Sequence, residues 1–178
     1  MTCRAAALMA LLLLSACATT EGPPASAPPT AQAAPVTAEF RTADFAWSTA
    51  AGAGRIEGAL AYRAKGETYA CGGAGVLLTP QTPWTRERMR ILYRSADYAA
   101  LPAAEVRGRT PPGRSSDYSA FVRRAACDAQ GRFAFAGLPD GAWYVITVAK
   151  SAAASGAPEM AIMRRVTTRG GKVIQVKL

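Results

Sequence analysis

Histidine is absent from this chain of 178 residues, and acidic residues are scarce, with 12 Asp and Glu against 21 Lys and Arg. Without an imidazole, Ser-His-Asp and Cys-His catalysis, His-ligated zinc and the usual general base near neutral pH are excluded. No apolar run reaches the roughly 20 residues that a membrane-spanning helix needs. The sequence therefore predicts no metal site and no cofactor.

The net charge indicates which surroundings suit the chain. A formal charge of +9 favours anionic neighbours such as phospholipid headgroups, lipopolysaccharide phosphates or cell-wall carboxylates. No aromatic-and-glycine pattern of a nucleic-acid-binding module is evident, and export argues against such a partner, so nucleic acid is not expected.

The first 16 residues have the layout of a secretory signal peptide. Arg4 gives a positive start, residues 5–14 form a short apolar segment, and Ser15 and Ala16 precede Cys17. The tetrad 14–17, Leu-Ser-Ala-Cys, resembles the lipobox of bacterial lipoproteins.

That resemblance implies cleavage before Cys17 and acylation of the cysteine with fatty acids such as palmitate. Two or three acyl chains give stable membrane anchoring. Because Ala18 rather than Asp follows the cysteine, the resemblance implies the outer membrane, with the domain facing the periplasm. The alternative is an ordinary cleaved signal with an incidental cysteine.

Residues 17–38 are rich in Ala, Pro and Thr and carry one charge, that of Glu21. Such a segment cannot bury enough apolar surface to fold, so it is expected to be a disordered, partly extended tether. The folded domain is then expected to span residues 39–178.

Two of the four cysteines are left for the domain. Cys3 would leave with the signal and Cys17 would carry lipid, which leaves Cys71 and Cys127. An even pair in an exported chain indicates a disulfide. Two free buried thiols are an alternative, and a metal site is disfavoured because two cysteines lack further ligands.

Short alternating segments dominate residues 39–178 and predict an all-β, antiparallel β-sandwich. The strongest pattern covers Trp143–Lys150, and Phe45 with Trp47 predicts a strand near the start. The other expected strands are Ile56–Tyr62, Val76–Leu78, Phe121–Cys127, Arg132–Ala136, Met160–Val166 and Val173–Leu178.

An insertion at about 82–120 interrupts the strands. Thr82 can cap a helix that begins at Pro83, and residues 99–120, with several Pro and Gly, look like a loop. Apolar residues at helical spacing follow the cap: Met89, Leu92, Tyr93 and Ala96.

Arg86, Arg90 and Arg94 recur every four residues on this expected helix. A basic stripe of guanidinium groups suits an anionic partner with phosphates or carboxylates. The alternative is an ordinary solvated helix face.

Residues 128–146 contain a sequence motif that resembles that of a known family. Asp128, Gly131, Phe133 and Phe135, followed by Leu-Pro at 138–139, resemble the D-x-x-G-x-F-x-F-x-x-L-P-x-G-x-Y-x-V signature of carboxypeptidase regulatory-like domains. The resemblance implies a seven-stranded transthyretin-like β-sandwich, with 82–120 as an insertion. It implies no activity of its own, since such domains act as structural or docking modules.

The function expected from these features is a lipid-anchored, non-catalytic structural or interaction module of the cell envelope. Its partner would be an envelope protein, lipopolysaccharide or the cell wall. The alternative is a carbohydrate- or cell-wall-binding module that uses exposed aromatics and arginines, with Trp84 as the tryptophan expected to be most exposed, beside Trp47 and Trp143. Glycoside hydrolysis needs a pair of carboxylates. Four are available, but their spacing favours no pair: Glu57, Glu67, Asp117 and Asp140.

Overall fold

The computed structural model describes residues 37–110, 118–153 and 156–178, except the side chains of 72–74. All of them belong to one compact unit, Ala31–Leu178. In chain order its elements are η1 (Thr42–Thr49), β1 (Gly54–Ala59), β2 (Arg63–Ala64), β3 (Glu67–Pro80), α1 (Pro83–Tyr93), β4 (Tyr98–Pro102), α2 (Ala103–Gly108), η2 (Ser119–Phe121), β5 (Arg123–Ala125), β6 (Arg132–Leu138), β7 (Gly141–Ser151), β8 (Met160–Thr168) and β9 (Val173–Lys177).

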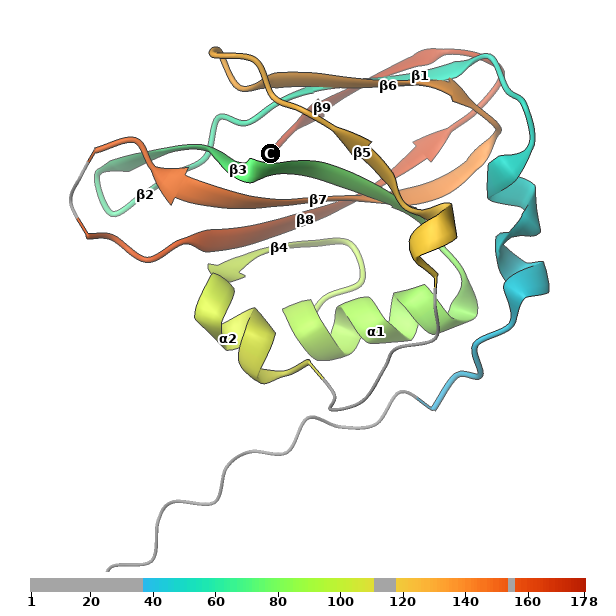
Figure 1. Cartoon of the computed structure of the whole chain (residues 1–178), viewed down its shortest axis with the longest axis horizontal. Coiled ribbons are helices and arrows are strands. Elements are labelled where there is room, and N and C mark those ends of the chain that lie inside the picture. Colours follow the sequence, from blue (N-terminus) through green and yellow to red (C-terminus); the bar gives the residue numbers. More distant parts are fainter. Residues whose placement is uncertain (1–36, 111–117, 154–155) are drawn as a thin grey trace, which may run out of the picture. The chain divides into compact units, whose positions relative to one another are not determined.

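Two sheets stack in a sandwich-like arrangement (Figure 1). The smaller sheet has the strand order β6-β1-β9, and the larger has the order β2-β3-β7-β8-β4, with β5 also paired to β3. The pairs are antiparallel except β1 with β9, which run parallel. The mostly β, two-sheet architecture predicted from alternation is confirmed, whereas the transthyretin-like topology stays a prediction.

The main core lies between the two sheets. Ile56 of β1 and Phe133 and Phe135 of β6 face Val145 and Ile162 of the larger sheet, and all five are buried. Successive residues of a strand point to opposite faces, so each of these strands sends every second residue into this core.

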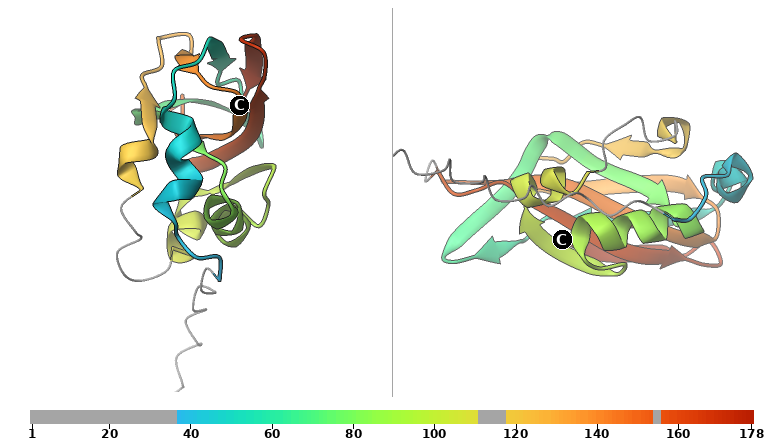
Figure 2. Two further views of the ribbon diagram at one scale, coloured as in Figure 1. Left: turned by 90° about the vertical axis from the view of Figure 1, so that its right-hand side faces the viewer. Right: turned by 90° about the horizontal axis from the view of Figure 1, so that it is seen from below.

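A second core lies on the other face of the larger sheet, where α1 and α2 pack (Figure 2). Met89 and Leu92 of α1 contact the cluster that contains Tyr144 and Met163. Since Trp143 and Tyr144 are both fully buried, β7 is covered on both faces. Within the described ranges, no helix has the length and apolarity needed to cross a bilayer.

Helix α1 begins where the sequence predicted. The Thr82 hydroxyl accepts a hydrogen bond from the Thr85 backbone N–H at 3.1 Å, and the Thr85 hydroxyl accepts one from Thr82 N–H at 2.7 Å. This reciprocal capping box, with Pro83 next to the cap, satisfies backbone donors that a helix start leaves unpaired. Arg94, with a left-handed φ of 55°, ends the helix.

Two of the predictions about secondary structure are wrong. The segment with Phe45 and Trp47, expected to be a strand, is the 3-10 helix η1. Phe45 packs there in a ring cluster with Phe40 and Phe121. The alternation of apolar residues along the sequence does not reveal these contacts. The expected loop 99–120 contains β4 and α2. Tertiary pairing of β4 with β8 overrides the local Pro and Gly signals there.

Candidate functional site

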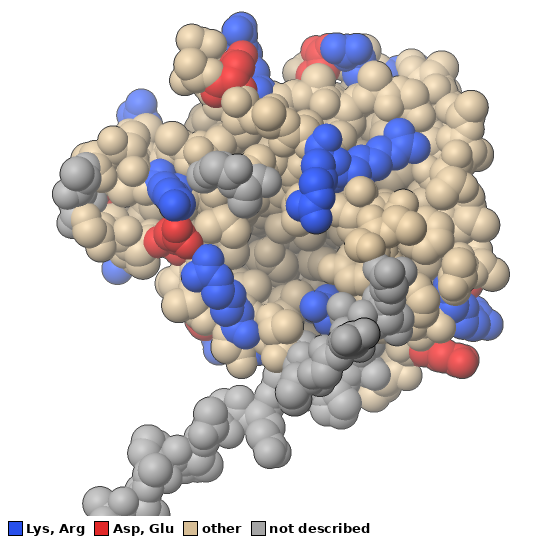
Figure 3. Space-filling model, in the orientation of Figure 1, with Lys and Arg blue, Asp and Glu red and all other residues tan. Residues whose placement is uncertain are grey.

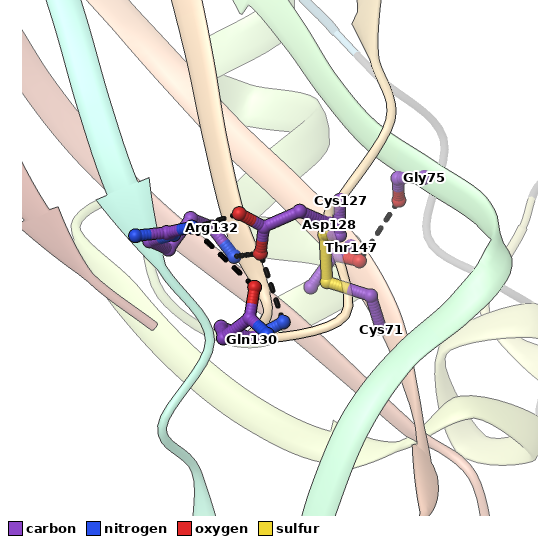
Figure 4. Close-up of a disulfide and its surroundings, with 7 residues drawn as sticks. All are labelled: Cys71, Gly75, Cys127, Asp128, Gln130, Arg132 and Thr147. Atoms are coloured by element: carbon purple, nitrogen blue, oxygen red, sulfur yellow. Dashed lines mark hydrogen bonds and ion pairs between the residues drawn. A yellow bond between two sulfur atoms is a disulfide. The ribbon is translucent and has the colours of Figure 1, made fainter.

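A disulfide joins Cys71 of β3 to Cys127, which precedes β6, with a Cα–Cα distance of 6.2 Å (Figure 4). The pairing agrees with the prediction made from the number of cysteines. The bond ties the connection between β5 and β6 to the long strand β3, across 56 residues of sequence.

The turn that follows the disulfide is held by one carboxylate. Asp128 Oδ1 accepts hydrogen bonds from Gln130 N–H at 2.9 Å and Arg132 N–H at 2.8 Å, and Oδ2 accepts one from Arg132 Nε at 2.7 Å. These bonds, led by that from the Arg132 backbone, hold the pKa of Asp128 below its ordinary value. Gly131 takes the left-handed φ of 74° that the turn requires. The Asp128 carboxylate and the Arg132 guanidinium are therefore held together near the disulfide (Figure 4).

Two hollows adjoin this turn, with volumes of about 490 and 660 Å³. Cys127 and Asp128 line both of them. The two hollows together are called the disulfide groove below, and its polar lining side chains include Glu57, Asp128, Gln130, Arg132 and Gln175.

A row of side chains across the smaller sheet lines the larger of the two hollows. Glu57 of β1 lies in register with Gln175 of β9 and Ala134 of β6. The Glu57 carboxylate accepts hydrogen bonds from Gln175 Nε2 at 3.1 Å and from Arg55 Nε at 2.6 Å. These contacts, led by that of Gln175, lower the pKa of Glu57. The small Ala134 leaves the surface beside the carboxylate uncovered.

The groove therefore offers charged acceptors, a guanidinium donor and amides that both donate and accept. Such a set can exchange hydrogen bonds with hydroxyl groups. Among the described residues, no group of three or more His, Cys, Asp or Glu is placed to hold a metal ion.

The predicted basic stripe is not a single surface. Arg94 lies beyond the last turn of α1 and its guanidinium forms an ion pair with Glu105 at 3.2 Å. Arg86 and Arg90 remain together and line a hollow of about 610 Å³ with Thr37 and Glu87. The reason is that α1 ends at Tyr93, so residue 94 no longer follows the helical spacing. Basic side chains are also more prominent than acidic ones on the face shown in Figure 3.

The tryptophans do not form a sugar-stacking surface. Trp143 is fully buried, and Trp84, expected to be the most exposed, retains only 6% of its surface. Trp84 is covered because it packs edge-on against Phe40 and Tyr118 at the start of α1. Trp47 is half-buried and lies edge-on to Trp143, with ring centroids 4.9 Å apart.

Cys17, the signal 1–16 and most of the tether lie outside the described residues, and lipidation stays a prediction. The end of the tether is described. Thr37 donates to Glu87 Oε1 from its backbone N–H at 3.0 Å and from its hydroxyl at 2.6 Å, and Ala38 N–H donates to Oε2 at 2.5 Å. These bonds lower the pKa of Glu87 and fix the start of the domain against α1.

Sequence reasoning missed the polar row of the groove. Glu57 was one of four carboxylates without a favoured partner, and Gln175 carried no signal. The alternation of β1 places Glu57 on the face opposite Ile56, which could have marked it as exposed. Its neighbour in β9 lies 118 residues away, and only the sheet topology brings the two together.

No protein-family model matches the chain, and no curated protein matches it. Among solved structures, the fold is similar to that of a proposed carbohydrate-binding protein from Pseudomonas aeruginosa, with a TM-score of 0.56 and 21% sequence identity. The match covers 79% of this chain and 99% of that one. At this identity the likeness establishes the β-sandwich fold.

Proposed function

We propose that this protein is a non-catalytic carbohydrate-binding module and that the disulfide groove holds the sugar. The observation that carries the proposal is the row of fixed donors and acceptors around two adjoining hollows. The similar structure from Pseudomonas aeruginosa, itself described as a proposed carbohydrate-binding protein, supports the same class of ligand. This proposal is preferred to a purely structural role because the polar side chains surround open space.

Each group has a role suited to sugar hydroxyls. The carboxylates of Glu57 and Asp128 accept, the Arg132 guanidinium donates, and the Gln175 amide does both. The hydrogen bonds of the Asp128 turn hold this part of the groove in place before a ligand arrives. A preformed site loses little side-chain entropy on binding, which raises affinity.

The sugar would be held by hydrogen bonds rather than by stacking on tryptophan. Val173, 51% exposed, lies two residues before Gln175 and thus on the same face of β9. Val173 lies outside the lining of the groove, and it offers an apolar contact for the ring carbons of a sugar that extends from Gln175 along β9.

The test is calorimetric titration of the full chain with cell-wall and lipopolysaccharide oligosaccharides. Gln175→Ala and Glu57→Ala should each weaken binding about tenfold, because each removes a hydrogen bond to a ligand hydroxyl. Glu39→Ala, a change of an exposed carboxylate outside the groove, is the matched control and should bind like wild type. Wild-type protein that binds none of these sugars, or equal affinity in all three variants, would refute the proposal.

The proposal also includes the family and the anchor. Buried Phe133 and Phe135, and the positive φ angles of Gly131 and Gly141, suit the core and turn positions of a carboxypeptidase regulatory-like, transthyretin-like domain. The tetrad that ends at Cys17 supports a lipid anchor, with the domain held at the outer membrane and facing the periplasm.

Cys17→Ala is expected to stop lipidation, so the chain either stays as an uncleaved precursor or appears in the soluble envelope fraction. Metabolic labelling with palmitate and membrane fractionation measure both effects. Cys3→Ala is the matched control, because this cysteine lies inside the expected signal and its loss should change neither labelling nor fractionation. Mature, labelled and membrane-bound Cys17→Ala protein would contradict the anchor.

A further inference from the structure

Strand β9 ends the smaller sheet, and its side away from β1 has no neighbouring strand (Figure 1). The bonds to β1 show which backbone groups are left over. Lys172 O accepts a hydrogen bond from β1 at 3.2 Å, and Leu178 N–H donates one to it at 3.0 Å. Because a strand of a parallel ladder bonds each neighbour through alternate residues, the even-numbered residues face β1. The backbone groups that point away from β1 are those of Val173, Gln175 and Lys177.

These outward groups have no partner in the described part of the chain. Strand β9 pairs with β1 alone, and no hydrogen bond reaches the backbone of Val173, Gln175 or Lys177 from elsewhere. The side chains of all three residues are exposed, and that of Val173 is apolar. A row of free donors and acceptors at a sheet edge is a template on which a further strand can pair.

The opposite edge of the smaller sheet, at β6, is covered. The odd-numbered residues of β6 bond β1, so its even-numbered residues face outward. Arg132, one of the outward residues, bonds to Asp128 with both its N–H and its C=O. The C=O of Ala136, another outward residue, accepts a hydrogen bond from the Arg123 guanidinium at 3.3 Å. Little of this edge is left for another strand.

The free edge of β4, in the larger sheet, is protected by other means. Asp97 O and Ala103 N–H bond the β8 segment, so the even-numbered residues of β4 face outward. Tyr98 N–H donates to the Ser95 hydroxyl at 3.2 Å, and Pro102 has no N–H to offer. Proline and covering groups are among the means by which proteins prevent strand pairing at an edge. Strand β9 has neither, which indicates that a partner covers its edge.

We propose that β9 pairs with β9 of a second copy of this chain, antiparallel and centred on Gln175. In this register Val173 lies opposite Lys177 of the other copy, and each outward residue exchanges both backbone bonds with its counterpart. Lys177, the charged residue of the strand, then faces an apolar side chain, which avoids the destabilising effect of like charges directly opposite each other. The lysine stem covers the exposed surface of Val173. The two smaller sheets become one continuous sheet.

A second copy suits this edge better than the tether does. The tether, residues 17–38, contains repeated prolines, which cannot donate to a ladder. By contrast, β9 is rich in β-branched residues, which favour strands. A two-fold axis at Gln175 gives both copies the same bonds, as in most soluble dimers. The pairing does not depend on the proposed sugar site, although Gln175 also lines the disulfide groove.

Sedimentation velocity of the full chain, without any sugar, tests the pairing. Two short strands bury less surface than a standard interface, so a dissociation constant on the order of 10 μM is expected. Val173→Pro should weaken association about tenfold, because it removes one outward N–H from each copy. The fold should persist in this variant, since proline is tolerated at the first residue of an edge strand, and circular dichroism checks that it does.

Two further substitutions at Val173 test the register. Val173→Lys sets like charges opposite each other twice in the symmetric interface and should weaken association about fivefold, whereas Val173→Glu sets a carboxylate opposite Lys177 and should strengthen it by a similar factor. Ala104→Lys adds the same charge at an exposed position of α2 and should associate like wild type. Equal effects of Val173→Lys and Val173→Glu would overturn the proposed pairing.

Hydrogen exchange locates the interface within the chain. The amides of Val173, Gln175 and Lys177 should exchange rapidly in dilute protein and become protected at concentrations where the chain is dimeric. The outward amide of Ala134, on the edge of β6, should exchange equally fast at both concentrations. A chain that is still monomeric at about 200 μM, well above the expected dissociation constant, or a dimer in which the three amides of β9 stay unprotected, overturns the proposal.

Discussion

The double variant Cys71→Ala/Cys127→Ala is expected to unfold with a free energy about 4 kcal/mol lower than that of the wild-type chain. The disulfide closes a loop of 56 residues, and its removal restores the conformational freedom of that loop in the unfolded state. For a domain of this size the loss corresponds to a fall in melting temperature on the order of 10 °C. Urea unfolding followed by circular dichroism measures it.

Reductant provides the control for this experiment. Wild-type protein treated with a thiol reductant should unfold like the double variant, and the double variant should not respond to reductant. Mass spectrometry of unreduced wild-type protein should find Cys71 linked to Cys127. Two alkylatable thiols, or equal stability of the two proteins, would refute the prediction.

The same variant tests how the groove depends on the bond. Cys127 directly precedes Asp128, whose carboxylate holds the polar turn. Without the disulfide this turn loses its covalent link to β3, so sugar affinity should fall.

Trp143→Ala is expected to cost about 4 kcal/mol of unfolding free energy. The side chain is fully buried, and its Nε1–H donates to the Thr168 hydroxyl at 3.1 Å. Its ring also contacts Trp47 and lies 5.6 Å from the guanidinium of Arg123. Removing the ring leaves a cavity between the sheets and loses these contacts together. Urea unfolding followed by far-ultraviolet circular dichroism avoids dependence on the lost fluorophore.

Trp143→Phe is the matched comparison, since it keeps an aromatic ring in the core and removes only the indole hydrogen bond and part of the volume. Its cost should be clearly smaller than that of the alanine variant. A loss below about 1 kcal/mol for Trp143→Ala, typical of a surface change, would show that the ring is not part of the core.

The sequence predicted best where one local rule decides the structure. The strand expected at Arg132–Ala136 follows from alternation, because Phe133 and Phe135 face the core, and it is observed at Arg132–Leu138. The start of α1 follows from the cap at Thr82. Neither depends on distant contacts. By contrast, β4 forms through pairing with β8, from Tyr98 opposite Arg164 to Pro102 opposite Met160, and no local pattern in 99–120 indicates that partner.

The candidate sites were less predictable for the same reason. Two members of the predicted stripe, Arg86 and Arg90, remain together, but Arg94 pairs with Glu105 because α1 ends before it. Tyr144 is buried beneath α1, and a run of apolar residues does not reveal that helices cover the second face of β7. The Glu57–Gln175 contact likewise depends on sheet order.

The parallel pairing of β1 with β9 has a mechanical consequence. Arg55 lies opposite Val173 and Ala59 opposite Lys177, and backbone bonds between Leu178 and both Ala59 and Ala61 extend the ladder. When the chain is pulled at the residues before Gly54 and at the end of β9, the two forces act in opposite directions along the paired strands. The strands are then sheared past each other along their length. The interstrand bonds then share the load instead of opening in turn, so this geometry resists stretching between the two ends of the domain.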